Sequence, residues 1–257
     1  MWFRNMRTNT NHIQATKTSL SIVDALIDLD GATATDVSSY LELPVSTTHN
    51  HLQTLVEGGY VVKDGERYRP SLRFLHIGEY TRGSYDVYEI ARPVIDDLAE
   101  ETGEVANLLV PEGGKGIYLH KAKGEKAVHH DTRPGKCVEL HCTALGKSIL
   151  MSLPSTEVDG IIETHGLPTY TDQTITDRDA LFEELDRTRE RGYAQNKGER
   201  NERLWCIAAP LLYGDKAVGA ISVSGPKTRM KGSRFEEEIP ELVLEAANVI
   251  EINLEYR

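Results

Sequence analysis

Apolar residues recur every three or four positions along three stretches near the start of the chain, residues 18–29, 35–41 and 46–56. This spacing is typical of helices that bury one face. Pro44 separates the second stretch from the third because proline does not fit inside a helix, and Gly58-Gly59 supplies the positive φ that ends the third. We therefore predict three short helices, the last two joined by a tight turn as in a helix-turn-helix.

The third predicted helix has one apolar face and one polar face. The apolar stripe consists of Val45, His49 or Thr48, Leu52, Leu55 and Val56. The polar face is uncharged and rich in hydrogen-bonding groups, which suits contact with base edges in a DNA major groove. Its candidate contacts are Ser46, which we also expect to cap the helix, Thr47, Thr48, Asn50, His51 and Thr54. The alternative is a surface helix with an ordinary polar side.

A hairpin is predicted directly after this helix. Residues 60–63 and 67–69 flank Asp64-Gly65-Glu66, and Asp-Gly between two extended segments is a strong hairpin signal. We predict the wing of a winged helix here. The candidate contacts to DNA phosphates are Lys63, Arg67 and Arg69, although basic residues on an exposed hairpin equally often serve solubility.

The remainder of the chain predicts an α+β fold. Helical spacing covers 71–82 and 86–102, where surplus apolar residues suggest a partner helix from another subunit. Beyond Glu104 we predict strand hairpins over 105–121 and 204–223, a third strand over 126–130, and helices over 143–153, 156–165, 177–191 and 234–256. The expected domains are a disordered tail (1–14), a winged helix-turn-helix (15–82), a linker helix (83–102) and an antiparallel sheet domain with flanking helices (103–257).

The composition narrows the class of protein. The first fourteen residues are polar and lack an apolar run, so we expect no signal peptide, no membrane span and a cytoplasmic location. The cysteines are odd in number and sparse, unlike a disulfide framework; they are Cys137, Cys142 and Cys206. Neighbouring His129-His130 and His141 do not complete a standard zinc spacing, so we expect no metal and no cofactor.

The net charge of −11 is unusual for a DNA-binding protein. Residues 1–80 hold seven Lys/Arg against nine Asp/Glu and so carry −2 of this charge. The acidity is concentrated beyond the predicted DNA-binding module, yet that module has no basic excess, and its attraction to phosphates must be local. An acidic surface with more Arg than Lys also suits a cytoplasm of high salt concentration.

Several motifs, taken in order, resemble the IclR family of transcriptional regulators over nearly the whole chain. They are Leu43-Pro44-x-Ser46-Thr47-x-His49, Leu52-x-Thr54-Leu55-x-x-x-Gly59-Tyr60-Val61, Thr102-Gly103-Glu104, Leu140-His141-x-Thr143-Ala144-Leu145-Gly146-Lys147, Arg189-x-Arg191-Gly192-Tyr193-Ala194, Cys206-Ile207-Ala208-Ala209-Pro210 and Ser222-Val223-Ser224-Gly225-Pro226. The resemblance implies a winged helix joined to a GAF-like effector domain. It also implies dimers, often paired into tetramers, on palindromic promoter DNA, with a small organic acid or related metabolite as effector.

The resemblance also implies an effector pocket. Its expected lining is Leu140, Thr143, Ala144, Leu145, Cys206, Ser222 and Ser224, together with Asn196, which occupies a position that often holds an acidic ligand contact. If Thr143 starts a helix, the N–H groups of Ala144, Leu145 and Gly146 would favour a carboxylate. Ser222 and Ser224 lie two apart on a strand and therefore face the same side.

The chain departs from the family pattern at functional positions. Asn50 stands where the family usually has Arg, which favours an adenine contact over a guanine contact. Arg203 replaces a Gly, so we expect a more positive and bulkier pocket mouth, which suggests an anionic or altered ligand, or a degenerate pocket. Two other functions compete with a regulator: a protein adaptor that uses the helix-turn-helix for protein contacts, and a thiol enzyme that uses Cys142 or Cys206 with His141. We expect no enzyme, because His141 and Cys142 are adjacent and no acid pair or nucleophile motif accompanies them.

Overall fold

The computed structural model describes residues 13–128 and 131–256 and divides the chain into two compact units. The smaller unit ends at Ser84 and the larger one begins at Tyr85. The predicted disordered tail over 1–14 lies outside the described residues up to residue 12, and Gln14 already belongs to the first helix. No helix among the described residues is long and apolar enough to cross a membrane.

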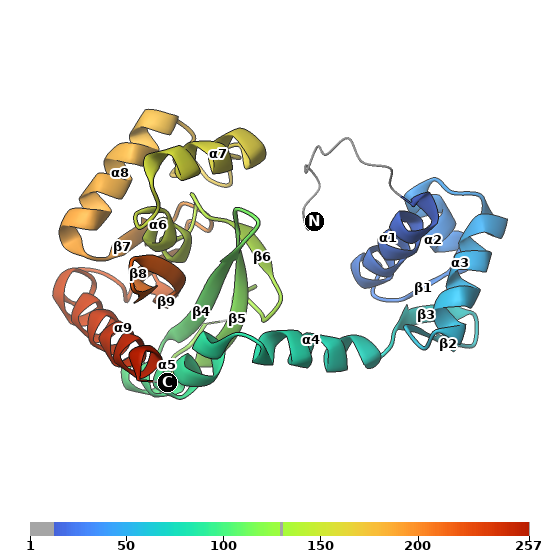
Figure 1. Ribbon diagram of the computed structural model, residues 1–257, viewed down its shortest axis with the longest axis horizontal. Helices are drawn as coiled ribbons and strands as arrows, with labels where there is room; N and C mark the ends of the chain where they lie inside the picture. Colours follow the sequence, from blue (N-terminus) through green and yellow to red (C-terminus); the bar gives the residue numbers. More distant parts are fainter. Residues whose placement is uncertain (1–12, 129–130, 257) are drawn as a thin grey trace. The chain divides into compact units, whose positions relative to one another are not determined.

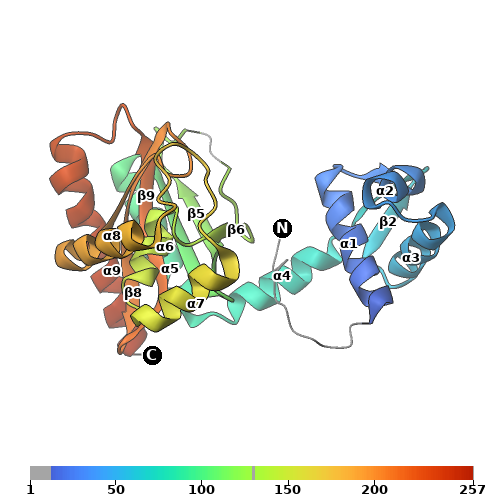
Figure 2. The same cartoon turned by 90° about the horizontal axis from the view of Figure 1, so that it is seen from above.

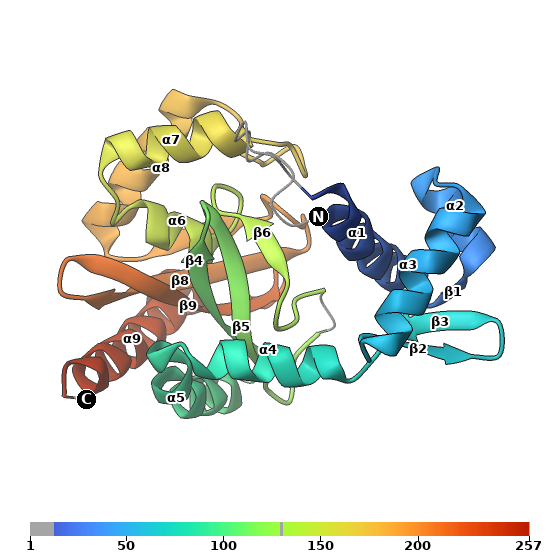
Figure 3. The ribbon, with the colours of Figure 1, turned by 45° about the vertical axis from the view of Figure 1, so that its right-hand side comes forward.

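The smaller unit combines helices with a three-stranded antiparallel sheet (Figure 1). Its elements are α1 (Gln14–Asp28), β1 (Ala32–Thr33), α2 (Ala34–Leu41), α3 (Val45–Glu57), β2 (Val61–Asp64), β3 (Arg67–Pro70) and α4 (Arg73–Gly83). The strand order is β1-β3-β2, and β2 and β3 form the predicted wing hairpin next to α3 (Figure 3). The helix-turn-helix and its wing are therefore present in the fold.

The starts of α1 and α2 differ from the prediction. α1 begins at Gln14, about one turn early, because no helix-breaking residue precedes Thr18. α2 begins directly after Thr33, whose hydroxyl accepts a hydrogen bond from the Asp36 N–H while the Asp36 carboxylate accepts one from the Thr33 N–H. This reciprocal capping box satisfies two backbone donors that the helix itself leaves unpaired.

The larger unit is built on a six-stranded sheet with the order β6-β5-β4-β9-β8-β7, antiparallel throughout. Its elements are α5 (Asp86–Thr102), β4 (Val105–Glu112), β5 (Lys115–Lys123), β6 (Cys137–Glu139), α6 (Ala144–Leu150), α7 (Ser155–His165), α8 (Arg178–Arg191), β7 (Ala194–Lys197), β8 (Leu204–Tyr213), β9 (Lys216–Pro226), the π-helical turn η1 (Arg234–Glu238) and α9 (Ile239–Glu255). The predicted α+β class is confirmed.

Helices cover both faces of this sheet. α5 and α9 pack on one face, and α6, α7 and α8 lie over the other (Figure 1). Figure 2 looks down on the second of these faces, with α7 in front. Successive residues of a strand point to opposite faces, so Ile221 and Val223 of β9 join the core with α5 and α9, whereas Ala220 joins the core with α6 and α8. The intervening Ser222 and Ser224 therefore face the second core.

One prediction for this unit needs correction. The described part of the predicted strand over 126–130 is irregular, and Cys137–Glu139 pairs with β5 instead. The helix expected as a linker over 83–102 corresponds to α5, which buries its apolar face in the larger unit. The element without any buried residue is α4, which precedes it. The strand β7 was not anticipated, since four residues give too short a pattern to recognise.

A glycine in α6 provides a test of this packing. A methyl group at Gly146 would overlap the backbone of Leu140, whereas one at Gly160 in α7 would meet no atom within 4 Å. We expect Gly146→Ala to lower the free energy of unfolding by about 2 kcal/mol or more, and Gly160→Ala to raise it by about 0.5 kcal/mol, because alanine favours helix. Equilibrium urea unfolding measures both, and equal effects of the two variants would contradict the packing described here.

Candidate functional site

Helix α3 presents a polar surface that carries no Asp, Glu, Lys or Arg before its last residue, Glu57. Its exposed polar side chains include Ser46, His49, Asn50, Gln53 and Thr54. Asn50 carries a carboxamide that can donate and accept at once, which is the pattern that an adenine edge requires in the major groove. The exposed face therefore suits base contacts better than phosphate contacts.

Three of the predicted DNA contacts on α3 lie elsewhere than expected. Thr48 is fully buried and its hydroxyl donates to the Pro44 carbonyl at 3.2 Å, so the prediction that it contacts DNA is wrong. A buried threonine is tolerated there because the carbonyl one turn earlier satisfies its hydroxyl. The His51 ring lies 2.8 Å from the Ser19 hydroxyl of α1, and Thr47 is half-buried.

Two predictions about the start of α3 also differ from the structure. The helix begins at Val45 after Pro44, and no side chain caps it, so Ser46 is a first-turn residue and not a cap. Val45 was expected in the buried stripe and is 51% exposed. The Thr54 hydroxyl donates to the Asn50 carbonyl at 2.9 Å, which leaves its acceptor lone pairs toward solvent.

The wing distributes its basic residues over both faces. Arg67 and Arg69 alternate with the buried Tyr68, and Lys63 lies 5.3 Å from the Tyr68 ring. Arg67 also donates a hydrogen bond to the Gly31 carbonyl, so part of its guanidinium serves the fold. Arg69 is exposed, as are Lys63 and Arg67, so it can reach a phosphate.

The larger unit encloses a cavity of about 280 Å³ on the side of the sheet that faces α6. Strands supply its floor, with Tyr118 from β5, Cys206 from β8, and Ser222 and Ser224 from β9. The start of α6 and the loops around residues 131, 170 and 200 supply the walls. Of the predicted lining residues, the cavity brings together Thr143, Ala144, Leu145, Asn196, Cys206, Ser222 and Ser224.

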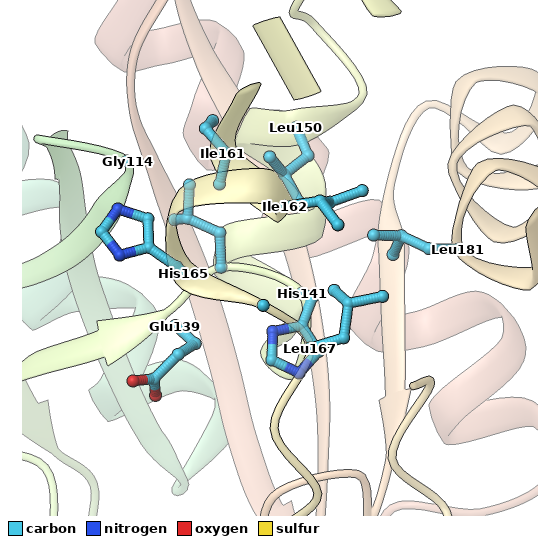
Figure 4. Close-up of a pocket in the computed structure, with 11 residues that line it drawn as sticks. Gly114, Glu139, His141, Leu150, Ile161, Ile162, His165, Leu167 and Leu181 are labelled. Carbon is cyan, nitrogen blue, oxygen red and sulfur yellow. The ribbon is translucent and has the colours of Figure 1, made fainter. Parts of the chain in front are cut away.

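Leu140 does not line this cavity. It contributes to a separate hollow of about 10 Å³ beneath α7. His141, Ile162 and Leu181 also line this hollow (Figure 4). A space of this size holds at most one water molecule. The expectation that Leu140 contacts the effector is therefore wrong, because its side chain packs in the core with α6.

Two polar lining groups are already engaged with the backbone. The Asn196 carboxamide donates to the Cys142 carbonyl at 2.8 Å and accepts from the N–H groups of Gly198 at 3.1 Å and Glu199 at 3.0 Å. The Thr143 hydroxyl accepts from the Gly146 N–H at 2.9 Å. Gly146 is thus not free to bind a carboxylate, contrary to the prediction.

Other lining side chains keep unused hydrogen-bonding capacity. Among the described residues, the Ser222 hydroxyl and Nη1 of Arg200 are buried without a hydrogen-bond partner. The Arg200 guanidinium lies 5.4 Å from the ring of Tyr170, another lining residue. The sequence did not predict Arg200 or Tyr170 as lining residues, because their loops carry no periodic pattern. Arg203, expected to narrow the pocket, is exposed and outside the lining.

The cysteines of the cavity lack the properties of nucleophiles. Burial raises the pKa of Cys142 to about 12 and that of Cys206 to about 11. His141, the proposed partner base, faces the small hollow, where its ring donates to the Pro168 carbonyl at 3.1 Å, and burial lowers its pKa. Neutral thiols without a facing base do not support the thiol-enzyme alternative.

Metal binding finds no support in the part of the chain that the structure describes. Within residues 13–128 and 131–256, no three His, Cys, Asp or Glu side chains are grouped to hold a metal ion. His129 and His130, considered above as ligands, lie outside the described residues.

A helix-turn-helix with a wing, followed by a sheet domain that contains a cavity of this size, is typical of transcriptional regulators that carry an effector-binding domain. The family described as "Bacterial transcriptional regulator IclR C-terminal" matches residues 80–252, and the IclR helix-turn-helix domain matches residues 18–65. The chain belongs to the IclR family of transcriptional regulators, and its C-terminal unit is an effector-binding domain. The relatives are named as regulators, which agrees with the prediction of no enzyme.

Individual relatives span nearly the whole chain. The probable HTH-type transcriptional regulator ArcR of Halobacterium salinarum is 36% identical over 242 residues, 92% of each chain. The crystal structure of the Thermotoga maritima IclR is 27% identical, with a TM-score of 0.79 over 95% of this chain and 99% of that one. An IclR homologue from Microbacterium hydrocarbonoxydans, solved in complex with 4-hydroxybenzoate, is 22% identical, with a TM-score of 0.78 over 93% of this chain and 100% of that one.

The raised thiol pKa values predict a pH profile for alkylation. Iodoacetamide reacts with the thiolate, and burial disfavours the thiolates of Cys142 and Cys206 in the folded protein. Their alkylation should therefore keep accelerating above the pH at which it levels off in urea, where a thiol titrates near its ordinary pKa of about 8.5. Mass spectrometry of each site gives both curves. A plateau at the same pH in folded and unfolded protein would contradict this assignment.

Proposed function

We propose that the chain binds palindromic promoter DNA as a homodimer or a dimer of dimers, and that a small organic acid or related metabolite in the C-terminal cavity modulates this binding. The observation that carries the proposal is the exposed, uncharged polar face of α3 next to a wing with an accessible Arg69. Such a face provides base contacts, and the wing provides phosphate contacts.

The size of the cavity supports a small effector. A volume of about 280 Å³ lies just below the usual range of ligand pockets, roughly 300–1,000 Å³. The Microbacterium homologue holds 4-hydroxybenzoate, a small organic acid, in the same fold. α5 packs on the effector sheet, and only Ser84 and Tyr85 separate it from α4, so an effector that alters α5 would act on the segment of chain that leads to the DNA-binding unit.

Pairing of two copies is supported by α4. This helix buries none of its residues, and Leu72, Leu75 and Tyr80, at or just before it, are 78%, 59% and 79% exposed. Large apolar side chains gathered on one short segment are typical of a protein interface. Two copies joined by this segment would place two recognition helices on the two halves of a palindrome.

Genomic footprinting with Asn50→Ala tests DNA binding. We expect discrete palindromic sites for the unmodified protein and a loss of about ten- to one-hundredfold in affinity for the variant, because a bidentate base contact contributes about 1–3 kcal/mol. Asn248→Ala, the same change at an exposed position of α9, is the control and should retain the sites. Absence of sites under every carbon source would reject DNA binding and favour the adaptor alternative.

Sedimentation equilibrium tests the pairing through α4. Leu75→Glu places a charge in the proposed interface and should weaken dimerisation by about tenfold or more, because a buried unpaired carboxylate is costly. Leu244→Glu makes the same change at a partly exposed position of α9 and should leave the dimer intact. Equal dimerisation of both variants would exclude α4 from the interface.

A further inference from the structure

We propose that Arg200 is the specificity-determining residue of the effector cavity: it binds an anionic group of the effector, so that the cavity selects an acid over the uncharged amide of the same shape. This inference rests on the effector function proposed above. It names the residue that binds the negative charge of the effector and the contacts that hold that residue in place.

Hydrogen bonds tie the loop that carries Arg200 to two other segments of the larger unit. Asn196 at its start bonds to the Cys142 carbonyl and to two N–H groups of the loop. On the opposite side, the Thr171 hydroxyl donates to the Gly198 carbonyl at 2.8 Å, and the Thr174 hydroxyl donates to the Glu199 carbonyl at 2.6 Å. The backbone next to Arg200 is thus fixed before any ligand arrives.

The acidic groups near the loop are committed to other cations. The Glu199 carboxylate pairs with the ammonium group of Lys147, which is 1% exposed and also lies 3.7 Å from Glu184. Asp131, at the rim of the cavity, pairs with Lys136. These pairs leave the positive charge of Arg200 without a matching carboxylate among the described residues.

The guanidinium of Arg200 lies near an aromatic ring but keeps an N–H group without a hydrogen-bond partner. Its plane is near the ring of Tyr170, whose hydroxyl donates to the Glu139 carboxylate, so the ring itself is anchored. Nη1 is buried and has no hydrogen-bond partner within the described chain. A buried N–H group that lacks a hydrogen-bonding partner is costly, and a ligand carboxylate that reaches Nη1 would remove that cost through a charge-assisted hydrogen bond.

The Ser222 hydroxyl offers a second unused contact in the same cavity. It lies on the sheet floor, is 1% exposed and has no partner among the described residues. The chemistry of the cavity thus fits a small acid that carries a further hydrogen-bonding oxygen, such as a hydroxy or oxo acid.

Matched acid and amide probes test the role of Arg200 in the full-length protein. We would titrate 4-hydroxybenzoate against 4-hydroxybenzamide, benzoate against benzamide, and pyruvate against pyruvamide by calorimetry, with thermal unfolding of each ligand-free variant as a folding check. At least one acid should bind about tenfold or more tightly than its amide, because a hydrogen bond to a charged group contributes that much.

Variants separate Arg200 from general electrostatics. Arg200→Gln should abolish the preference for the acid, and Arg200→Lys should retain part of it, because the charge remains but the planar fork is lost. Arg203→Gln removes the same charge from an exposed residue three positions away, outside the cavity lining, and should behave as the unmodified protein.

The outcomes distinguish this inference from the proposed function. If no acid binds more tightly than its amide, or if Arg200→Gln keeps the preference, Arg200 does not read the charge and the inference is overturned, whatever the protein does on DNA. If an acid binds through Arg200 but leaves DNA affinity unchanged, the inference stands and the proposed regulation by that acid fails.

Discussion

The alternation of side chains along β8 and β9 is the constraint on which the effector domain depends. At the centre of the sheet, Ile221 and Val223 fill the core with α5 and α9, so Ser222 and Ser224 must point to the other face, beneath α6. A shift of one residue in register would expose the apolar pair to the cavity and bury both hydroxyls in the apolar core. Packing of one face of the sheet therefore determines the chemistry of the cavity on the other.

Local signals were sufficient for the elements that position the DNA-binding face. Pro44, the Gly58-Gly59 pair and Asp64-Gly65 each act within a few residues. The structure has helix α3 between the first two signals and the turn of the β2–β3 hairpin at the third. Register within α3 was harder to predict, because the burial of Thr48 rather than His49 depends on contacts with α1 and α2. Strands β1 and β7 are too short to show a pattern and exist because a neighbouring strand pairs with them.

The cavity lining was predictable only in part, and the reason is physical. Residues on regular elements, such as Thr143 and Ser222, follow from motif order and strand alternation. The direction of Arg200 depends on bonds between segments far apart in sequence, from Asn196 to Cys142 and from Thr171 to Gly198. Leu140 belongs to a matching motif, yet its side chain enters the core, since one turn of backbone separates it from the start of α6.

The uncharged amide of Asn196 leaves the positive charge of Arg200 without a neutralising carboxylate at position 196. Asn196 donates to the Cys142 carbonyl while it accepts from two backbone N–H groups. A carboxylate has no proton to donate at neutral pH and would face the Cys142 carbonyl oxygen without a hydrogen bond. It would also bring a negative charge into the cavity that contains the Arg200 guanidinium, where the two would neutralise each other. With the uncharged amide, the loop keeps its shape and Arg200 keeps an unneutralised charge. Asn196 therefore holds the loop through three hydrogen bonds without adding a negative charge to the cavity.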